Sequence, residues 1–441
     1  MTDEHFLTIA IDPCSPLVFR SGKPFGDIGQ SGSAEGFEFP APGTIAGAVR
    51  AAYADAVSWE FKDQGKDKKS HRRLVESVSV EGPLLAWFGH DHSVSLLVPK
   101  PADAFYYEDN RRLFVQALRP RQAKFLEERC DLPSHLMSLS RDGDVDPQKP
   151  AGGPAYWYLD QVVRWLIENG QRSTGGVGLA GPVAEVRQHV TLDADRLAHV
   201  RGQFYESAGR DFGSTASGNG GWDPPMGLVA RLRVAESEQA PGKIVGHMRR
   251  VGADGRQAVF RAGGEWPGPD GNLVKKLAEL ERGDVFRLLL VTPAIFENGW
   301  YPKWLAPNQD GYLEGEIPEA NCQVRLVAAA VDRWRPYSGW SMAEGKQRAI
   351  RRMVPAGAVY WFQLLDAIPA DWTKLWLRSV CSHDSIRNDG FGLVLPGLAP
   401  GVKVEDRAPS APDLPETTAK APARKPFWRR LLASLFPRPR A

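Results

Sequence analysis

The sequence predicts an α+β protein built from two domains, with long loop insertions and a disordered C-terminal tail. The chain of 441 residues is long enough for two or three domains. Strand-like segments followed by helix-like segments occur in both halves, which favours two α+β units. Glycine and proline, with 44 and 35 residues, form about 18% of the chain against a usual value of about 12%, which indicates many turns and long loops.

The first half opens with a strand and then a helix. Residues 5–11 alternate their side chains with the period of a strand whose two faces are both partly covered. Residues 44–59 carry apolar side chains at helical spacing, and Thr44 is the expected N-cap of that helix. Further elements are expected as a helix over 156–168 and strands over 183–192 and 227–234.

The pattern starts again after residue 283. Apolar strands are expected over 285–291, 324–331 and 358–365, followed by a helix over 371–380. This repeat of strand and helix signals predicts an N-terminal domain at 1–240 and a C-terminal domain at 241–400. The boundary is expected between about 235 and 285.

The end of the chain differs in composition and charge. Residues 401–423 are rich in Pro, Ala, Thr and charged residues without an apolar period, which predicts a disordered linker. Residues 424–441 hold six basic and no acidic residues, so residues 1–423 carry −4, from 49 basic and 53 acidic residues. A basic amphipathic helix is expected there, able to dock in a partner groove, contact nucleic acid or lie on an anionic membrane. Its expected interaction residues are Phe427, Trp428, Arg429, Arg430, Leu431 and Leu435.

Several function classes are disfavoured by what the sequence lacks. The four cysteines lie far apart without a CxxC pair, so we expect neither a zinc knuckle nor a disulfide framework, and we favour a cytoplasmic setting. The sequence contains no run of about 18 apolar residues, so we expect no transmembrane helix. The acidic start lacks the basic region of a secretory signal.

No motif predicts catalysis or a cofactor. Residues 176–181 match GxGxxG, but a probable helix end precedes them and a strand-like run follows, so a loop is the better interpretation. His90 and His92 lack a third metal ligand at suitable spacing. The cluster of Cys381, His383 and Asp384 lacks the surroundings of a nucleophile. We therefore expect a protein that is not an enzyme and binds no cofactor.

What remains is a set of basic, aromatic and glycine-flanked segments. Cations and rings on turns can meet phosphates and stack on bases, a helix N-terminus can bind an anion, and glycines allow close approach of a backbone. Each segment taken alone is better explained as a solvated loop or a capping element. The candidate RNA-binding residues are Arg20, Lys23, Phe25, Gly43, Thr44, Arg50, Arg249, Arg250, Lys346, Arg351, Arg352, Gly390 and Gly392.

The order of these segments resembles a known family. The run from Asp12 to Phe25, with Leu17-Val18-Phe19-Arg20-Ser21-Gly22-Lys23-Pro24, is followed by Phe39-Pro40-Ala41-Pro42-Gly43-Thr44-Ile45-Ala46-Gly47. Gly339-Trp340, then Arg351-Arg352-Met353-Val354-Pro355-Ala356-Gly357, and finally Gly390-Phe391-Gly392-Leu393 complete the pattern. Together they resemble the third subunit of the Cmr complex, the type III-B CRISPR effector, within the RAMP superfamily.

The resemblance implies two ferredoxin-like, RRM-like domains with long loop insertions. It implies a non-catalytic role in antiviral defence: gripping the 5′ handle of CRISPR RNA. The implied partners are the large polymerase-like subunit and the first backbone RAMP subunit. The acidic body requires that RNA binding rest on local patches and on partner subunits. The tail has no counterpart in the family pattern.

Two other functions stay open at the level of sequence. The chain could be a RAMP endoribonuclease that processes CRISPR precursor RNA with a histidine general acid/base, for which His5, His71, His90 and His92 are candidates. It could also be a purely protein-bridging scaffold, in which the basic loops pair with carboxylates of neighbouring subunits.

Overall fold

The structure is a computed structural model, and its described residues form part of one compact unit, Met1–Glu405. It describes residues 5–404 except 22–31, 35, 61–67, 90–92, 122–135, 142–148, 169, 171, 194, 197, 214–225, 236–237, 239–240, 343 and 367–370. Lys23, Phe25, His90 and His92 lie outside the described residues, as do the predicted helix at 424–441 and the predicted linker from residue 405 onward.

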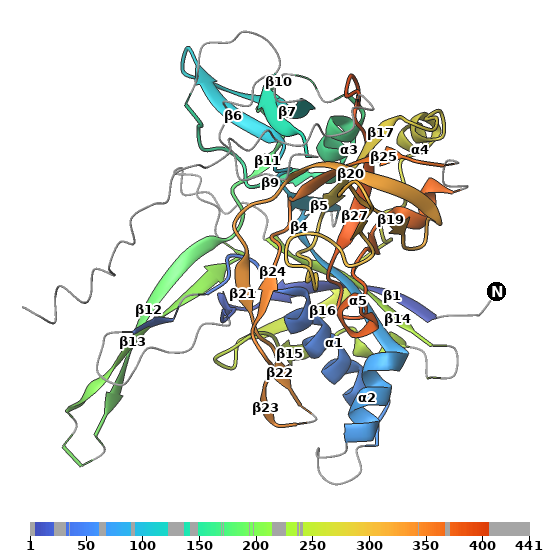
Figure 1. Cartoon of the computed structure of the whole chain (residues 1–441). Helices are drawn as coiled ribbons and strands as arrows, with labels where there is room; N and C mark the ends of the chain where they lie inside the picture. The colour runs from blue at the N-terminus through green and yellow to red at the C-terminus, as the bar shows by residue number, and fades with distance from the viewer. Residues whose placement is uncertain are drawn as a thin grey trace, which may run out of the picture. The chain divides into compact units, whose positions relative to one another are not determined.

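A large antiparallel sheet organises the first half of the chain (Figure 1). Its centre has the order β16-β1-β14-β4, formed by β1 (His5–Pro13), β4 (Val78–Phe88), β14 (Met226–Val234) and β16 (Gln257–Ala262). Three strands extend it beyond β4: β5 (Val94–Pro99), β9 (Tyr156–Tyr158) and β11 (Gly178–Leu179). Strand β15 (Met248–Arg250) extends it beyond β16.

Two helices connect β1 to β4. Helix α1 (Pro42–Ala56) buries Ile45, Val49 and Tyr53 and contacts β4. Its N-cap is Ala41 and Pro42 opens the first turn, so Thr44 lies inside the helix and not at the predicted cap. Helix α2 (Lys68–Ser77) is strongly charged and, of its residues, only Leu74 is buried.

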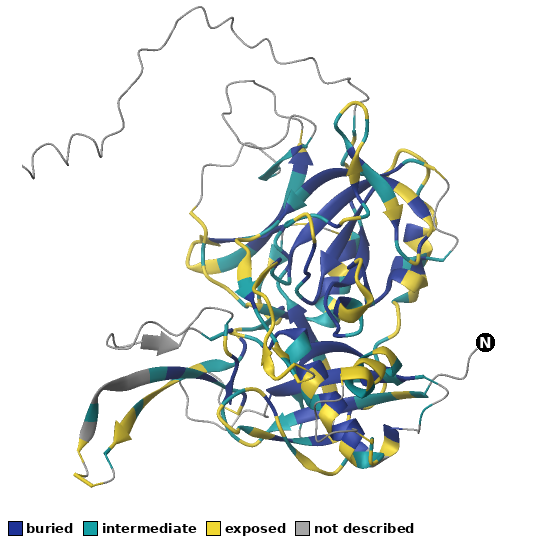
Figure 2. Ribbon diagram, turned by 60° about the horizontal axis from the view of Figure 1, so that its bottom comes forward, coloured by how far each residue is buried: buried dark blue, intermediate teal, exposed yellow. Residues whose placement is uncertain are grey.

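A second antiparallel sheet organises the second half, and its central strands are mostly buried (Figure 2). Its centre has the order β27-β17-β25-β20, formed by β17 (Val285–Leu290), β20 (Cys322–Ala330), β25 (Val359–Leu364) and β27 (Leu393–Leu398). Strands β26 (Arg378–Ser379), β19 (Leu313–Ile317) and β18 (Ala306–Pro307) extend it.

The helix predicted over 371–380 is wrong. The segment forms a single 3-10 turn, η2 (Trp372–Leu375), and then strand β26. Asp371 caps the turn through the backbone N–H of Thr373, and Leu377 takes φ +53°, which ends helical winding. Trp372 and Leu375 are buried, so the apolar spacing reflects a loop folded onto a core.

Smaller elements surround these two sheets. One small sheet is formed by β6 (Ala104–Asp109), β7 (Arg112–Arg121), β8 (Ser138–Arg141) and β10 (Arg172–Ser173). Another is centred on β13 (His199–Asp211), which pairs with β12 (Val183–Leu192), β2 (Leu17–Val18) and β3 (Gly32–Ala34). Two short hairpins are β21 (Arg335–Tyr337) with β24 (Arg351–Met353), and β22 (Trp340–Ser341) with β23 (Lys346–Gln347). The remaining helical elements are α3 (Leu159–Glu168), η1 (Pro241–Ile244), α4 (Gly271–Leu277) and α5 (Asp384–Arg387).

The change from the first sheet to the second falls after residue 240, inside the interval 235–285 expected for the boundary. Strands β15 and β16, which follow that residue, pair in the first sheet, so the change to the second sheet falls between Ala262 and Val285. The halves also exchange elements. Helix α3, from the first half, contacts β27, where a side chain at Gly397 would collide with Leu166.

One buried ion pair joins the halves beneath α3. Arg287 of β17 and Asp103 are both fully buried and form an ion pair. Trp165 of α3 donates its Nε1–H to Asp103 at 2.9 Å and accepts from Arg287 through its backbone oxygen. Burial lowers the pKa of Arg287, while the Asp103 carboxylate opposes that shift.

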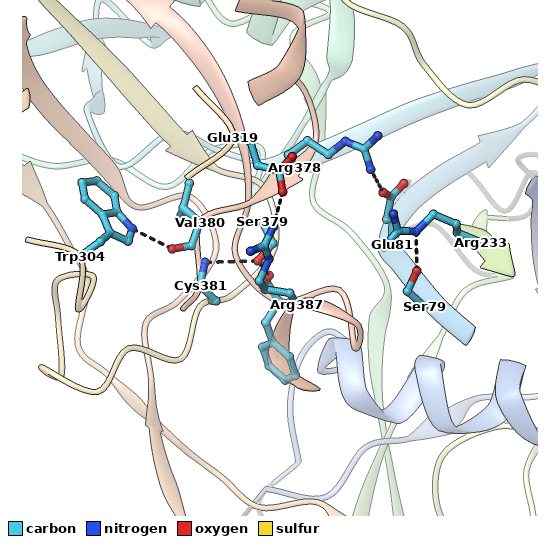
Figure 3. A network of polar contacts seen from close by, with 11 residues as sticks. Ser79, Glu81, Arg233, Trp304, Glu319, Arg378, Ser379, Val380, Cys381 and Arg387 are labelled. Atoms are coloured by element: carbon cyan, nitrogen blue, oxygen red, sulfur yellow. Dashed lines mark hydrogen bonds and ion pairs between the residues drawn. The ribbon is translucent and has the colours of Figure 1, made fainter. Parts of the chain in front are cut away.

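A second set of polar contacts joins the halves at β4. Arg378 of β26 donates to Glu81 of β4 at 2.6 Å, beside the bond from Arg233 to Ser79 at 2.9 Å (Figure 3). The backbone N–H of Val80 donates to Asn388 at 2.9 Å. We call the contacts of 80–82 with 378–392, together with those of Arg50 described below, the β4 joint.

Removing Arg287 leaves the Asp103 carboxylate buried without its counter-charge. We expect Arg287→Met to lower the free energy of unfolding by about 3–5 kcal/mol, measured by urea unfolding of the full chain. Arg287→Met combined with Asp103→Leu should recover most of that loss, because no lone charge remains.

Arg164→Met is the matched control, because Arg164 forms an ion pair with Glu168 on the exposed face of α3, the helix that contacts the buried pair through Trp165. It should change the free energy of unfolding by less than about 1 kcal/mol. Equal effects of the Arg287 and Arg164 variants would contradict the importance of the buried pair.

Candidate nucleic-acid interface

The structure separates the predicted RNA-binding residues into an internal group and a surface group. Gly43, Arg50, Gly390 and Gly392 pack against other parts of the protein, as their contacts show below. Arg20, Arg249, Arg250 and the basic residues between 346 and 352 lie nearer the surface.

The N-terminus of α1 is covered by side chains from the second half. A side chain at Gly43 would collide with the hydroxyl of Tyr337 and would lie 3.4 Å from a carboxylate oxygen of Asp389 and 3.5 Å from the ring of Phe391. These groups lie where the anion proposed for this helix end would bind. Gly43 therefore allows close packing, and Thr44 lies beside it within the first turn.

Arg50 holds α1 to the β4 joint. It is 6% exposed, forms an ion pair with Asp389, and donates to the backbone oxygens of Val78 at 2.8 Å and Asn388 at 2.7 Å. Its guanidinium is engaged by these groups within the protein, which gives this residue a packing role.

The predicted glycine-rich loop approaches a backbone, and that backbone belongs to the same chain. Gly390 has φ +87°, and a side chain there would collide with the backbone oxygen of Gly82. Gly392 has φ +72°, and a side chain there would lie 2.6 Å from the sulfur of Cys381. Both glycines are buried within the β4 joint.

Three of the predicted RNA-binding cations lie near the surface of the first half of the chain. The side chain of Arg20 is 49% exposed and forms an ion pair with Asp254 at 2.9 Å. On the edge strand β15, Arg249 pairs with Asp55 at 3.2 Å and Arg250 is exposed.

A further group of cations lies on a projection made of the two short hairpins. We call residues 333–353 the basic arm: β21 and β24 form its base, β22 and β23 form its tip, and Figure 1 shows it running from the second sheet past α1. Its basic residues are Arg333, Arg335, Lys346, Arg348, Arg351 and Arg352. Its exposed large apolar residues are Trp334, Trp340, Met342 and Ile350.

Tyr337 anchors the basic arm to the protein. Its ring packs on Phe391 with centroids 5.2 Å apart, and burial raises the pKa of its hydroxyl to about 12. Within the arm, Ser338 donates to the backbone oxygen of Arg348 at 2.7 Å, and Arg348 donates its N–H to Gly339 at 2.8 Å. The guanidinium of Arg348 lies 3.7 Å from Asp389. The tip of the arm is therefore held in a defined place beside α1.

A cleft of about 790 Å³ lies between the base of the arm and residues 295–301. Arg351 and Arg352 line one side, and Tyr301 and His383 line another. His383 contacts Glu297 at 2.9 Å through its Nε2 atom. The Arg352 guanidinium lies 5.2 Å from the centre of the Trp334 ring. Cations beside aromatic rings suit the phosphates and bases of a single strand.

Sequence reasoning named Lys346, Arg351 and Arg352 as candidates and quoted Trp340 in the family pattern, but it did not single out Trp334 or Tyr301. Their signal was local: aromatic residues placed between Gly, Pro and basic residues, as in the run Arg333-Trp334-Arg335-Pro336. Such rings outside apolar strands are candidates for stacking.

The other candidate residues that the structure describes lie in separate places. Cys381 is fully buried, and burial raises the pKa of its thiol to about 11, so the sulfur is a protonated neighbour of the β4 joint. His5 lies in β1 and His71 in α2. Residues 178–179 form β11, a short edge strand, and not the helix of a dinucleotide site.

Neither a metal cluster nor a membrane span is seen in the described part of the chain. Within it, no three His, Cys, Asp or Glu residues gather as metal ligands. Among the helices of the same residues, none is long and apolar enough to cross a membrane.

The fold and surface define an α+β protein with a basic, aromatic arm mounted on two joined antiparallel sheets. The family described as CRISPR-associated protein (Cas_Cmr3) matches residues 9–399. The chain belongs to this family.

Three solved structures are similar to the chain. Two are chains of the type III-B Cmr-beta complex, one bound to cognate target RNA and AMPPnP and one bound to cognate target RNA. Each has 14% identity and a TM-score of 0.41, covering 80% of this chain and 86% of that chain. The third, from the Csm3-Csm4 subcomplex of the type III-A CRISPR-Cas interference complex, has 9% identity and a TM-score of 0.29, covering 83% of this chain and 94% of that one. No curated protein matches the sequence.

Gly43→Ala tests how the arm is anchored. The added methyl group meets the Tyr337 hydroxyl, so the ring and the arm have to move. We expect faster trypsin cleavage after Lys346, Arg348 and Arg351 than in the unmodified chain, measured by mass spectrometry of timed digests.

Gly47→Ala is the control, one turn further along the same helix, where an added methyl group meets nothing within 4 Å. It should leave cleavage of the arm unchanged and raise the free energy of unfolding by about 0.5–1 kcal/mol. Unaltered digestion of Gly43→Ala would show that Tyr337 does not hold the arm.

Proposed function

We propose that the chain is the third subunit of a type III-B CRISPR effector complex, acting in the cytoplasm in antiviral defence. In this role it is a non-catalytic RNA-binding protein that grips the 5′ handle of CRISPR RNA. It bridges to the large polymerase-like subunit and to the first backbone RAMP subunit. Family membership supports the CRISPR context, and the basic arm with its adjoining cleft supports contact with RNA.

We propose that both halves derive from a ferredoxin-like domain. The first half orders its central strands β16-β1-β14-β4 and the second orders them β27-β17-β25-β20. In each half the first strand along the chain pairs with the third and the fourth, and the second pairs with the third. This is the strand order of a β-α-β-β-α-β unit. Helices α1 and α2 stand between the first two central strands of the first half, and α5 stands between the last two central strands of the second half.

The observation that carries the RNA-binding role is the density of cations and rings on the basic arm. Arg351 and Arg352 are exposed at the base of the arm, and Trp334 lies beside them. Residues 1–423 carry a net charge of −4, so attraction of RNA depends on such a local patch. Arg20, with Lys23 and Phe25 beyond the described residues, forms a second proposed contact in the same interface.

Arg351→Ala combined with Arg352→Ala should weaken binding of CRISPR RNA. The slope of log K against log salt should become shallower by about 1.4, because each lost phosphate contact to a single strand contributes about 0.7. The measurement is filter binding of the full chain across a salt series. Arg164→Ala, an exposed arginine on α3, is the control and should change neither affinity nor slope.

The pair Arg20→Ala and Lys23→Ala should act in the same direction, with a further shallowing of the slope. Unchanged affinity and slope in both double variants would support the protein-bridging scaffold, in which these cations pair with carboxylates of neighbouring subunits. Crosslinking of the assembled complex to RNA separates the two, because a bridging scaffold gives no RNA adduct.

The non-catalytic role has its own test. Repeat RNA incubated with the purified chain and a chelator should stay intact on a denaturing gel. Cleavage that one of His5→Ala, His71→Ala, His90→Ala or His92→Ala abolishes would instead establish a histidine-dependent endoribonuclease.

A further inference from the structure

A groove of about 1000 Å³ runs between α1, α2 and the tip of the basic arm. It lies apart from the cleft at the base of the arm, and no residue lines both. Figure 1 shows the tip hairpin β22–β23 beside α1, with α2 close to them. The RNA-binding proposal does not use this groove.

Small side chains of α1 form one wall of the groove. Gly47, Ala51 and Ala54 line it, at the spacing of a single helix face. A side chain added at Gly47 would meet nothing within 4 Å, so the space over this turn is open. Such a smooth surface lets another helix pack with its backbone close to α1.

The arm supplies the apolar rim of the groove. Trp340 is 60% exposed and Met342 is 69% exposed, and both line it. Large apolar side chains exposed in this way, close together, are typical of protein interaction sites. The flexible thioether of a methionine adapts to the shape of a partner.

The charges of the groove favour an acidic partner. Each carboxylate that lines it already faces a cation: Asp55 faces Arg249 at 3.2 Å, Glu76 faces Arg72 at 3.6 Å, and Glu344 faces Lys346 at 2.9 Å. The fourth carboxylate, Asp389, pairs with Arg50. Counted over the whole lining, five cations, Arg50, Lys68, Lys69, Arg72 and Arg348, exceed these four carboxylates.

We propose that this groove binds an amphipathic helix of a partner protein. Its small and apolar face lies on α1 and under Trp340 and Met342, and its carboxylates face α2. The open lining positions from Gly47 to Ala54 span about 10 Å of α1, which matches about two turns of a partner helix. Single-stranded RNA is a poorer occupant of the α1 wall, because that wall offers no ring for stacking and its one lining cation, Arg50, is engaged with Asp389. This inference concerns a protein partner and does not rest on the proposed RNA-binding function.

The probe is a fluorescein-labelled synthetic helical peptide of about 14 residues, with alanine and leucine at positions i, i+3, i+4 and i+7 and glutamate on the opposite face. Fluorescence anisotropy with the full chain should show saturable binding. A peptide with lysine in place of each glutamate should not bind. The same assay with the peptide of residues 424–441, which holds six basic and no acidic residues, asks whether the chain's own tail occupies the groove.

Gly47→Gln fills the groove at a position where the fold leaves room for a side chain. We expect it to weaken peptide binding by about tenfold or more, as does the loss of one interface anchor. Trp340→Ala should act in the same direction. Gly271→Gln is the matched control, because Gly271 lies in α4 with nothing within 4 Å of an added side chain.

Three results would overturn the proposal. The first is that the acidic peptide shows no saturable binding. The second is that Gly47→Gln leaves its binding unchanged. The third is that a basic peptide binds equally well or more tightly. A single-stranded RNA oligonucleotide that loses affinity with Gly47→Gln, while the acidic peptide does not, would assign the groove to nucleic acid. Arg351→Ala with Arg352→Ala should not alter peptide binding, so failure of the RNA-binding role is distinguished from failure of this inference.

Discussion

The buried ion pair between Arg287 and Asp103 is the constraint on which the arrangement of the two sheets depends. Both side chains are removed from water, so each charge is tolerated only while the other is present. The pair sits under α3, which belongs to the first half and packs on the second sheet. The orientation of the second sheet is therefore specified by a polar contact as well as by apolar packing, and the β4 joint adds a second point of attachment.

Much of the strand framework could be predicted from local sequence, and the joints could not. Residues 5–11, 285–291, 324–331 and 358–365 are apolar runs, and each prediction is confirmed within a residue or two of the observed strand. Helix α2 was missed because its exposed sequence buries a single residue. Arg50 and Asp389 are 339 positions apart, so no local pattern distinguishes a cation held in that pair from one presented to RNA.

The glycines show the same limit in another form. Their lack of a side chain indicates that another group can approach closely, but it does not indicate which group does. At Gly390 it is the oxygen of Gly82, and at Gly43 the neighbours are side chains of Tyr337, Asp389 and Phe391. Lys346, Arg351 and Arg352 are exposed on the basic arm, and such cations can be proposed from local sequence because they need no distant partner to be recognised.

The exchange of elements between the halves has a consequence for how the chain can be divided. Helix α3 is encoded before the second sheet that it covers, and the basic arm is encoded after helix α1, beside which it lies. A fragment ending between residues 262 and 285 would lose the arm, and the complementary fragment would lack the helix that shields its own sheet. The two halves therefore form separate sheets, but each half supplies an element that packs on the other. Any engineered split of the chain has to bring both fragments back together.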